Sequence, residues 1–121
     1  MPAGCVLVVE DDQDIREGLL DTLTDHGYQS RGAANGRDAL DAMRTQHYTP
    51  CMILLDIMMP VMDGVAFREE QLRDPDLAGI PVVLISAHRD LAEKAKTLKA
   101  AAYLAKPLKL KDLLALTDEY C

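Results

Sequence analysis

Short, wholly apolar runs that stop at a polar residue are the feature of this chain that most constrains its fold. Three of them occupy residues 6–9, 51–55 and 81–85, and an acidic or hydroxyl side chain follows each one. A strand with one face in water alternates apolar and polar residues, whereas a strand buried on both faces does not. These runs therefore predict parallel strands in a sheet that helices cover on both faces.

Helical patterns fill the intervals between the apolar runs. Ile15, Leu19 and Leu23 recur at a spacing of four residues, and Gly27 is a typical residue for ending a helix. Asn35 is a typical N-cap for the next helix. The remaining elements are expected at these positions: helices at 36–46, 64–73, 90–99 and 108–120, and strands at 28–33 and 102–105.

Five strands that alternate with five helices predict an α/β fold with a single doubly wound parallel sheet. The length of 121 residues suits one domain, which we place over residues 1–121 with no output domain in this chain. Right-handed crossovers between parallel strands place the five helices on both faces of the sheet.

Charge is unevenly distributed along a chain whose net charge is −7. Residues 1–88 carry 15 acidic and 6 basic side chains (−9), and residues 89–121 carry 5 acidic and 7 basic ones (+2). Nucleic-acid binding needs clustered Lys and Arg that neutralise phosphates, which this acidic balance disfavours. No apolar run approaches the ~20 residues that span a bilayer, and no signal-peptide pattern opens the chain. We therefore expect a cytoplasmic protein that contacts neither nucleic acid nor membrane directly.

The three cysteines, Cys5, Cys51 and Cys121, are an odd number at spacings that match no zinc motif. A chain of this length builds a core without covalent cross-links. We expect all three to be reduced thiols in the cytosol.

The polar residues that follow the strands are the candidate functional residues: Glu10, Asp11, Asp56, Ser86 and Lys106. In open α/β sheets, the binding crevice lies beyond the carboxyl ends of the strands. The fold should therefore bring these residues, which are distant in sequence, into one crevice.

Three carboxylates in one crevice repel one another, and a bound cation relieves that repulsion. Mg²⁺ prefers oxygen ligands, which Glu10, Asp11 and Asp56 supply, and no His or Cys lies near them in sequence to favour a softer metal. Lys106 and Ser86 offer a positive charge and a hydroxyl donor to phosphoryl oxygens. Asp56 directly follows an apolar strand and is the best-placed nucleophile for forming an aspartyl phosphate.

Four segments of the chain together resemble the receiver domain of two-component response regulators, over essentially its whole length. In order, they are LVVEDD at 7–12, DIMMPVMDG at 56–64, SA at 86–87 and YLAKP at 103–107. The D-x-x-M-P-x-x-D-G pattern is highly specific, and the order and spacing of the other segments add to it.

The resemblance implies a flavodoxin-like sheet with strand order 2-1-3-4-5. It also implies that Asp56 accepts a phosphoryl group from the phosphohistidine of a sensor histidine kinase or phosphotransfer protein. Mg²⁺ would be held by Asp11, Asp56 and the backbone carbonyl of Met58, with Glu10 acting through water. Lys106 would contact the phosphoryl group, and its peptide bond to the following proline would be cis.

The resemblance further implies a conformational switch. Ser86 would move toward the phosphoryl group while Tyr103 turns inward, and this would change the surface built from residues 90–99, 102–105 and 108–120. The chain would not be an enzyme beyond catalysing its own phosphorylation and dephosphorylation. We expect a bacterial monomer or weak dimer that alters its binding to an unidentified downstream protein.

Particular residues bear on three other functions. A phosphohydrolase of the haloacid dehalogenase class needs a second Asp where Met58 stands. A Rossmann nucleotide-binding domain needs a glycine-rich loop where residues 10–12 are acidic. A pseudo-receiver that binds partners without phosphorylation is compatible with Lys99, where the family usually has Gly, and with a short interval between Ser86 and Lys106. That interval predicts a shortened or irregular helix before the last strand.

Overall fold

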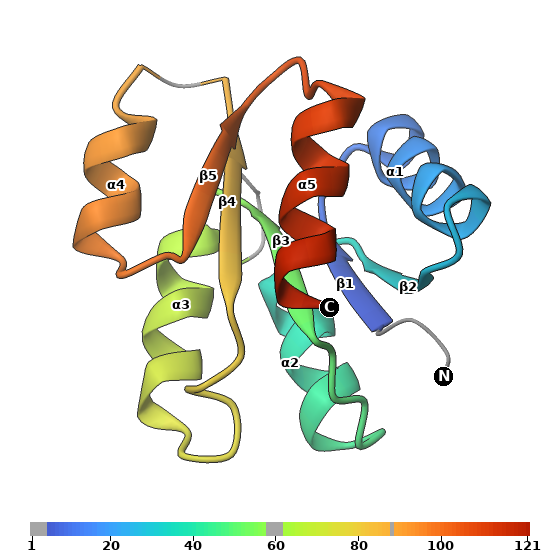
Figure 1. The fold of residues 1–121 in the computed structure, drawn as a ribbon. Coiled ribbons are helices and arrows are strands. Elements are labelled where there is room, and N and C mark those ends of the chain that lie inside the picture. The colour runs from blue at the N-terminus through green and yellow to red at the C-terminus, as the bar shows by residue number, and fades with distance from the viewer. Residues whose placement is uncertain (1–4, 58–61, 88) are drawn as a thin grey trace.

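A computed structural model describes residues 5–57, 62–87 and 89–121 of the chain. These residues form a five-stranded sheet in the order β2-β1-β3-β4-β5, and every neighbouring pair is parallel (Figure 1). The strands are β1 Cys5–Val9, β2 Gln29–Ala33, β3 Met52–Asp56, β4 Val82–Ser86 and β5 Ala102–Ala105. The predicted α/β fold and the strand order that the resemblance implied are both confirmed.

Five helices connect or follow these strands in the described residues: α1 Gln13–Asp25, α2 Gly36–Arg44, α3 Gly64–Arg73, α4 Leu91–Thr97 and α5 Leu110–Tyr120. α1 and α5 cover one face of the sheet, and α2, α3 and α4 cover the other (Figure 1). Successive strand residues point to opposite faces, so Leu7 packs in the α2–α3–α4 layer and Val8 in the α1–α5 layer. Burial on both faces explains why β1, β3 and β4 read as continuous apolar runs.

In the described residues, no helix combines the length and the apolar character that crossing a bilayer requires.

Short side chains of the expected types cap three helices. The carboxylate of Asp12 accepts from the Ile15 amide at 3.1 Å and so begins α1. The Asn35 side chain accepts from the Asp38 amide at 2.9 Å, and Asp63 caps α3 in the same way. These contacts satisfy amides that have no partner inside the helix.

α4 is shorter than the pattern over 90–99 predicts, because the chain turns out of the helix after Thr97. Lys99 lies in the left-handed region with a φ of 55°. A left-handed residue ends a helix, and glycine is favoured there because it has no Cβ to clash. The expected helix over 90–99 is therefore corrected to Leu91–Thr97, and Lys99 lies just beyond its C-cap, Leu98.

A buried arginine fixes this end of α4 to α3. Arg68 is 5% exposed; its Nε donates to the Leu98 carbonyl and its Nη2 to the Lys99 carbonyl, each at 2.9 Å. Its Nη1 donates to Gln71 Oε1 at 2.7 Å, and Gln71 is itself fully buried. Carbonyls at the C-terminus of a helix carry partial negative charge and favour a cation. Arg68 therefore holds the backbone at Lys99 in place.

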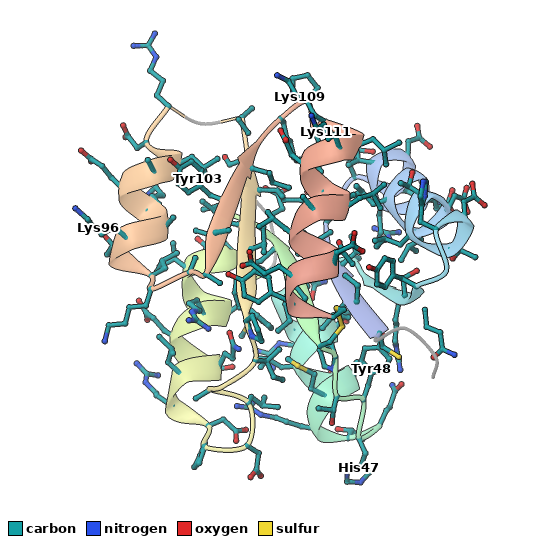
Figure 2. All side chains as sticks on the ribbon, viewed as in Figure 1. His47, Tyr48, Lys96, Tyr103, Lys109 and Lys111 are labelled. Atoms are coloured by element: carbon teal, nitrogen blue, oxygen red, sulfur yellow. A yellow bond between two sulfur atoms is a disulfide. The ribbon has the colours of Figure 1, made fainter. Side chains whose placement is uncertain are left out.

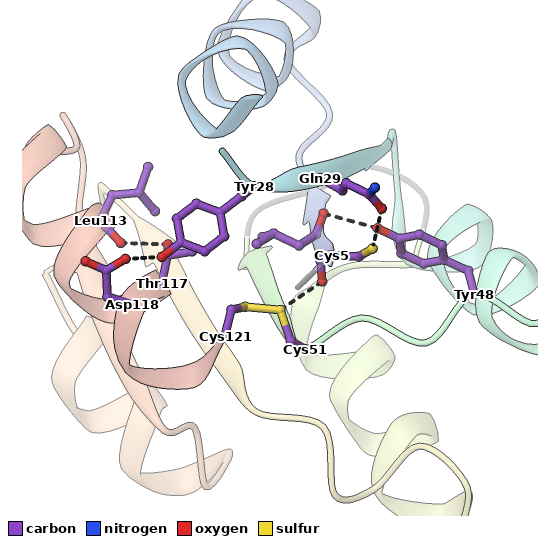
Figure 3. The surroundings of a disulfide bond; sticks show 10 residues. Cys5, Tyr28, Gln29, Tyr48, Cys51, Leu113, Thr117, Asp118 and Cys121 are labelled. Atoms are coloured by element: carbon purple, nitrogen blue, oxygen red, sulfur yellow. Dashed lines mark hydrogen bonds between the residues drawn. A yellow bond between two sulfur atoms is a disulfide. The ribbon is translucent and has the colours of Figure 1, made fainter. Parts of the chain in front are cut away.

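The expectation that all three cysteines are reduced is wrong for two of them. Cys51 and Cys121 form a disulfide although they are 70 positions apart in sequence, and Cys5 is free (Figure 3). α5 runs back along the sheet against the strand direction, so Cys121, the residue after it, lies beside Cys51, the residue before β3. Cysteine spacing in the sequence carries no information about this contact.

Gly64 begins α3, and the reason for a glycine there is close packing. A left-handed backbone is not the reason, because the φ of Gly64 does not lie in that region. A Cβ at Gly64 would lie 2.8 Å from the Asp56 carbonyl oxygen and 2.8 Å from Ile57 Cα. Both are backbone atoms, so rotation of a side chain cannot relieve the contact.

Gly64→Ala is therefore expected to lower the free energy of unfolding by about 1–3 kcal/mol, since the new methyl group must displace the backbone of Asp56. Gly18→Ala is the matched control, because Gly18 lies in α1 with nothing within 4 Å of an added Cβ. The control should gain about 0.5–1 kcal/mol from the better helix propensity of Ala. Urea unfolding measures both; equal stability of Gly64→Ala and wild type would contradict the packing argument.

Candidate functional site

The polar residues singled out in the sequence meet at the carboxyl edge of the sheet. Glu10 and Asp11 follow β1, Asp56 ends β3, Ser86 ends β4 and Lys106 follows β5. β1 neighbours β3, β3 neighbours β4 and β4 neighbours β5, so the strand order places these ends side by side. All five residues line one cleft of about 450 Å³.

The ammonium group of Lys106 contacts two carboxylates from two other strands. Its Nζ lies 2.7 Å from Glu10 Oε1 and 3.3 Å from Asp56 Oδ2. Glu10 is fully buried and Asp56 is 2% exposed, so little water separates these charges. Ion pairs in such surroundings are stronger than pairs on an open surface.

Glu10, Asp11 and Asp56 form a carboxylate cluster at the same place. In the described residues, one oxygen of each lies within 4.8 Å of the others. Three negative charges face one ammonium, which leaves the cluster with an excess of negative charge. Oxygen ligands at this spacing suit a divalent cation such as Mg²⁺, so the residues present fit the metal expected from the sequence. Met58, whose carbonyl was expected to be a further ligand, lies outside the described residues.

The shifts of two pKa values follow from this arrangement. Loss of hydration raises the pKa of Asp11 above its ordinary value, and the hydrogen bond and negative charge of Glu10 raise it further. Burial lowers the pKa of Lys106, but the hydrogen bond to Glu10 and the charges of Asp56 and Glu10 outweigh it, so the pKa lies above its usual value. Lys106 is therefore cationic at neutral pH, and Asp11 is ionised less readily than a free aspartate.

Neighbouring groups hold the acidic loop after β1 in place. The Asp12 amide donates to Glu10 Oε2 at 3.2 Å, so both oxygens of Glu10 accept from the protein. Arg16 Nη1 donates to the Glu10 carbonyl at 2.8 Å. Arg16 is not among the residues predicted from the sequence; its position four residues after Asp12, one helical turn into α1, is the signal that could have identified it. Ile15 belongs to the helical apolar pattern but is 39% exposed and lines the mouth of the cleft.

Ser86 and Tyr103 lie in different surroundings. Ser86 is 1% exposed and lines the cleft, and α4 has Asp90 as its N-cap, so Ser86 does not cap that helix. Tyr103 lies on β5 and is 48% exposed, beside α4 and away from the cleft (Figure 2). The Lys106–Pro107 peptide bond is cis, as the resemblance implied.

Comparison with known proteins identifies the family. Residues 6–118 match the family model of the response regulator receiver domain. Response regulator MprA of Mycolicibacterium vanbaalenii is 36% identical over 112 residues, which are 91% of this chain and 47% of that protein. The chain thus spans about half the length of the curated relatives it matches.

Solved structures agree with this assignment. A signal receiver domain of a signal transduction histidine kinase from Syntrophus aciditrophicus has a TM-score of 0.84 at 32% identity, covering 98% of this chain and 89% of that one. Chemotaxis protein CheY4 of Vibrio cholerae has a TM-score of 0.86 at 28% identity, covering 97% and 98%. Fold and similarity together define a signalling domain of two-component systems. The chain belongs to the response regulator receiver domain family.

The raised pKa of Asp11 gives a pH-dependence that can be measured without any ligand. A raised carboxyl pKa means that the folded state binds the proton more tightly, so wild-type stability should fall relative to Asp11→Asn as pH rises through the ordinary Asp pKa. Thermal unfolding from pH 3.5 to 7 in a metal chelator measures the difference.

Added Mg²⁺ provides the second arm, because a bound cation favours the charged carboxylate. It should stabilise wild type more at pH 7 than at pH 4 and stabilise Asp11→Asn less. Parallel pH profiles of the two proteins in chelator would contradict the raised pKa of Asp11.

Proposed function

We propose that this receiver domain is a phosphorylation-dependent switch in which Asp56 is the phosphoryl acceptor. The contact of Lys106 with both Glu10 and Asp56 is the observation that carries the proposal. This contact supports a division of the cleft into an acidic side, suited to a cation, and a basic side, suited to phosphoryl oxygens. Asp56 lies between the two.

In the proposed reaction, an Asp56 carboxylate oxygen attacks phosphorus while the phosphorus–nitrogen bond of a phosphohistidine breaks. The imidazole nitrogen leaves with the bonding electrons. Lys106 would stabilise the charge on the phosphoryl oxygens, and the Ser86 hydroxyl would donate to one of them. Mg²⁺ held by Glu10, Asp11 and Asp56 would supply positive charge that offsets the repulsion between the acidic cluster and an incoming anion.

The proposed output is a change in the surface formed by α4, β5 and α5. A phosphoryl group on Asp56 adds negative charge beside Ser86 and so favours a state in which Ser86 moves toward it and Tyr103 turns inward. Tyr103 is largely exposed in the present structure, which leaves that movement available. Lys96, Lys109 and Lys111 project from the same region and give it a basic character (Figure 2).

We further propose that the donor is a sensor histidine kinase or phosphotransfer protein and that an unidentified downstream protein reads the altered surface. The chain itself would not bind nucleic acid or membrane, since its net charge is −7. It would act in the bacterial cytoplasm as a monomer or weak dimer. Its catalysis would be limited to its own phosphorylation and dephosphorylation.

Incubation with acetyl phosphate and Mg²⁺, followed by intact-mass measurement, tests the assignment of Asp56. Wild type should gain one phosphoryl group, and Asp56→Asn should gain none because an amide oxygen is a poor nucleophile. Asp63→Asn is the matched control, since Asp63 is an exposed acid of the same segment that serves as the α3 N-cap; it should still be modified. Failure of wild type to gain mass would favour the pseudo-receiver.

A further inference from the structure

A second pair of reactive groups lies outside the acidic cleft. Cys51 precedes β3 and Cys121 follows α5, and their Cα atoms are 5.4 Å apart (Figure 3). Cysteine pairs with this separation can be joined by a disulfide without backbone movement. The bond closes a loop between residues that are 70 positions apart, so it constrains more than half of the chain.

The pair lies at the edge of the sheet opposite the cleft. β3 begins one residue after Cys51 and ends at Asp56. Five residues of extended strand span about 17 Å. At this distance, we expect oxidation or reduction of the sulfurs not to alter the direct contacts of Lys106 or of the carboxylate cluster.

The disulfide attaches the last turn of α5 to the sheet. Leu113 and Thr117 are buried, but Asp118, Glu119 and Cys121 are exposed. Besides the bond, that turn is held by the Cys121 amide, which donates to the Thr117 carbonyl at 2.8 Å, and by a hydrogen bond from the Tyr28 hydroxyl to Asp118 (Figure 3). Leu116 and Tyr120 also pack, partly buried, against the core on this face of the sheet. The ends of helices fray more readily than their middles, and the covalent bond opposes fraying here by joining this turn to the residue before β3.

The sulfurs are placed for exchange with small thiols and disulfides. Cys121 is exposed and Cys51 is partly exposed. Cys51 Sγ also lies 3.1 Å from the Cys5 carbonyl oxygen, which can accept from the thiol when the bond is reduced. The fold thus accommodates both states of Cys51. The Cys5 thiol lies against Gln29 Oε1 at 3.2 Å and takes no part in the bond.

We propose that Cys51 and Cys121 are a reversible redox modification site that fastens the end of α5 to the start of β3. In the forward step, one cysteine thiolate attacks a low-molecular-weight disulfide and releases one thiol. The other cysteine then attacks the mixed disulfide and releases the second thiol. Two protein thiols and one small disulfide become one protein disulfide and two small thiols, so atoms and electrons balance. In a reducing compartment such bonds are typically transient and regulatory, which suits an exposed pair.

The test starts from the full 121-residue chain, reduced and then equilibrated with oxidised and reduced glutathione at varied ratios. Alkylation, intact mass and peptide mapping should show loss of two thiols within a monomer, a linked Cys51–Cys121 peptide and a Cys5 that still reacts. Cys5→Ser is the matched control and should oxidise as wild type does, whereas Cys121→Ser should not form the bond. Asp56→Asn should also oxidise normally, which separates this proposal from phosphoryl acceptance.

The structural consequence is measured on the oxidised and reduced forms of the same wild-type protein. Oxidation should raise Tm by on the order of 10 °C, because it closes a long loop. It should also slow hydrogen exchange several-fold at the amides of residues 117–121, with little change at residues 10–12. A bond that involves Cys5, a disulfide between two molecules, or equal exchange of the α5 end in both forms would overturn the proposal.

Discussion

The contact of one ammonium group with carboxylates from two other strands is the interaction on which the rest of this structure depends. Lys106 reaches Glu10 at 2.7 Å and Asp56 at 3.3 Å only because β1, β3 and β5 run parallel and end at the same edge. Because Glu10, Asp11 and Asp56 all lie at that edge, their carboxylates come close together and repel one another. The lysine offsets part of this repulsion, and the remaining negative charge makes the cleft suited to a divalent cation.

Packing around the cleft keeps these groups at fixed positions. Gly64 lets the start of α3 approach the backbone of Asp56 more closely than any larger residue could. Arg16 and the Asp12 amide hold the acidic loop after β1. At a distance from the cleft, the guanidinium of Arg68 donates to the Leu98 and Lys99 carbonyls and so holds the C-terminal end of α4, the helix beside Tyr103.

Much of this could be predicted from the sequence because it depends on local signals. Apolar runs identified β1, β3 and β4, Asn35 identified the N-cap of α2, and strand ends identified the cleft residues. Contacts between distant segments could not be predicted in the same way. The Cys51–Cys121 bond depends on where α5 ends over the sheet, and the packing role of Gly64 depends on how closely α3 approaches β3. The left-handed backbone at Lys99 had a single signal in the sequence, which is that the family usually has glycine at this position.

Magnesium binding to wild type and to Lys106→Met, measured by calorimetry at one ionic strength, tests the electrostatic account most directly. Removing the ammonium takes away the positive charge that competes with the metal for Glu10 and Asp56. The account predicts several-fold tighter Mg²⁺ binding by Lys106→Met than by wild type. Equal or weaker binding by the variant, with its fold intact by circular dichroism, would contradict it.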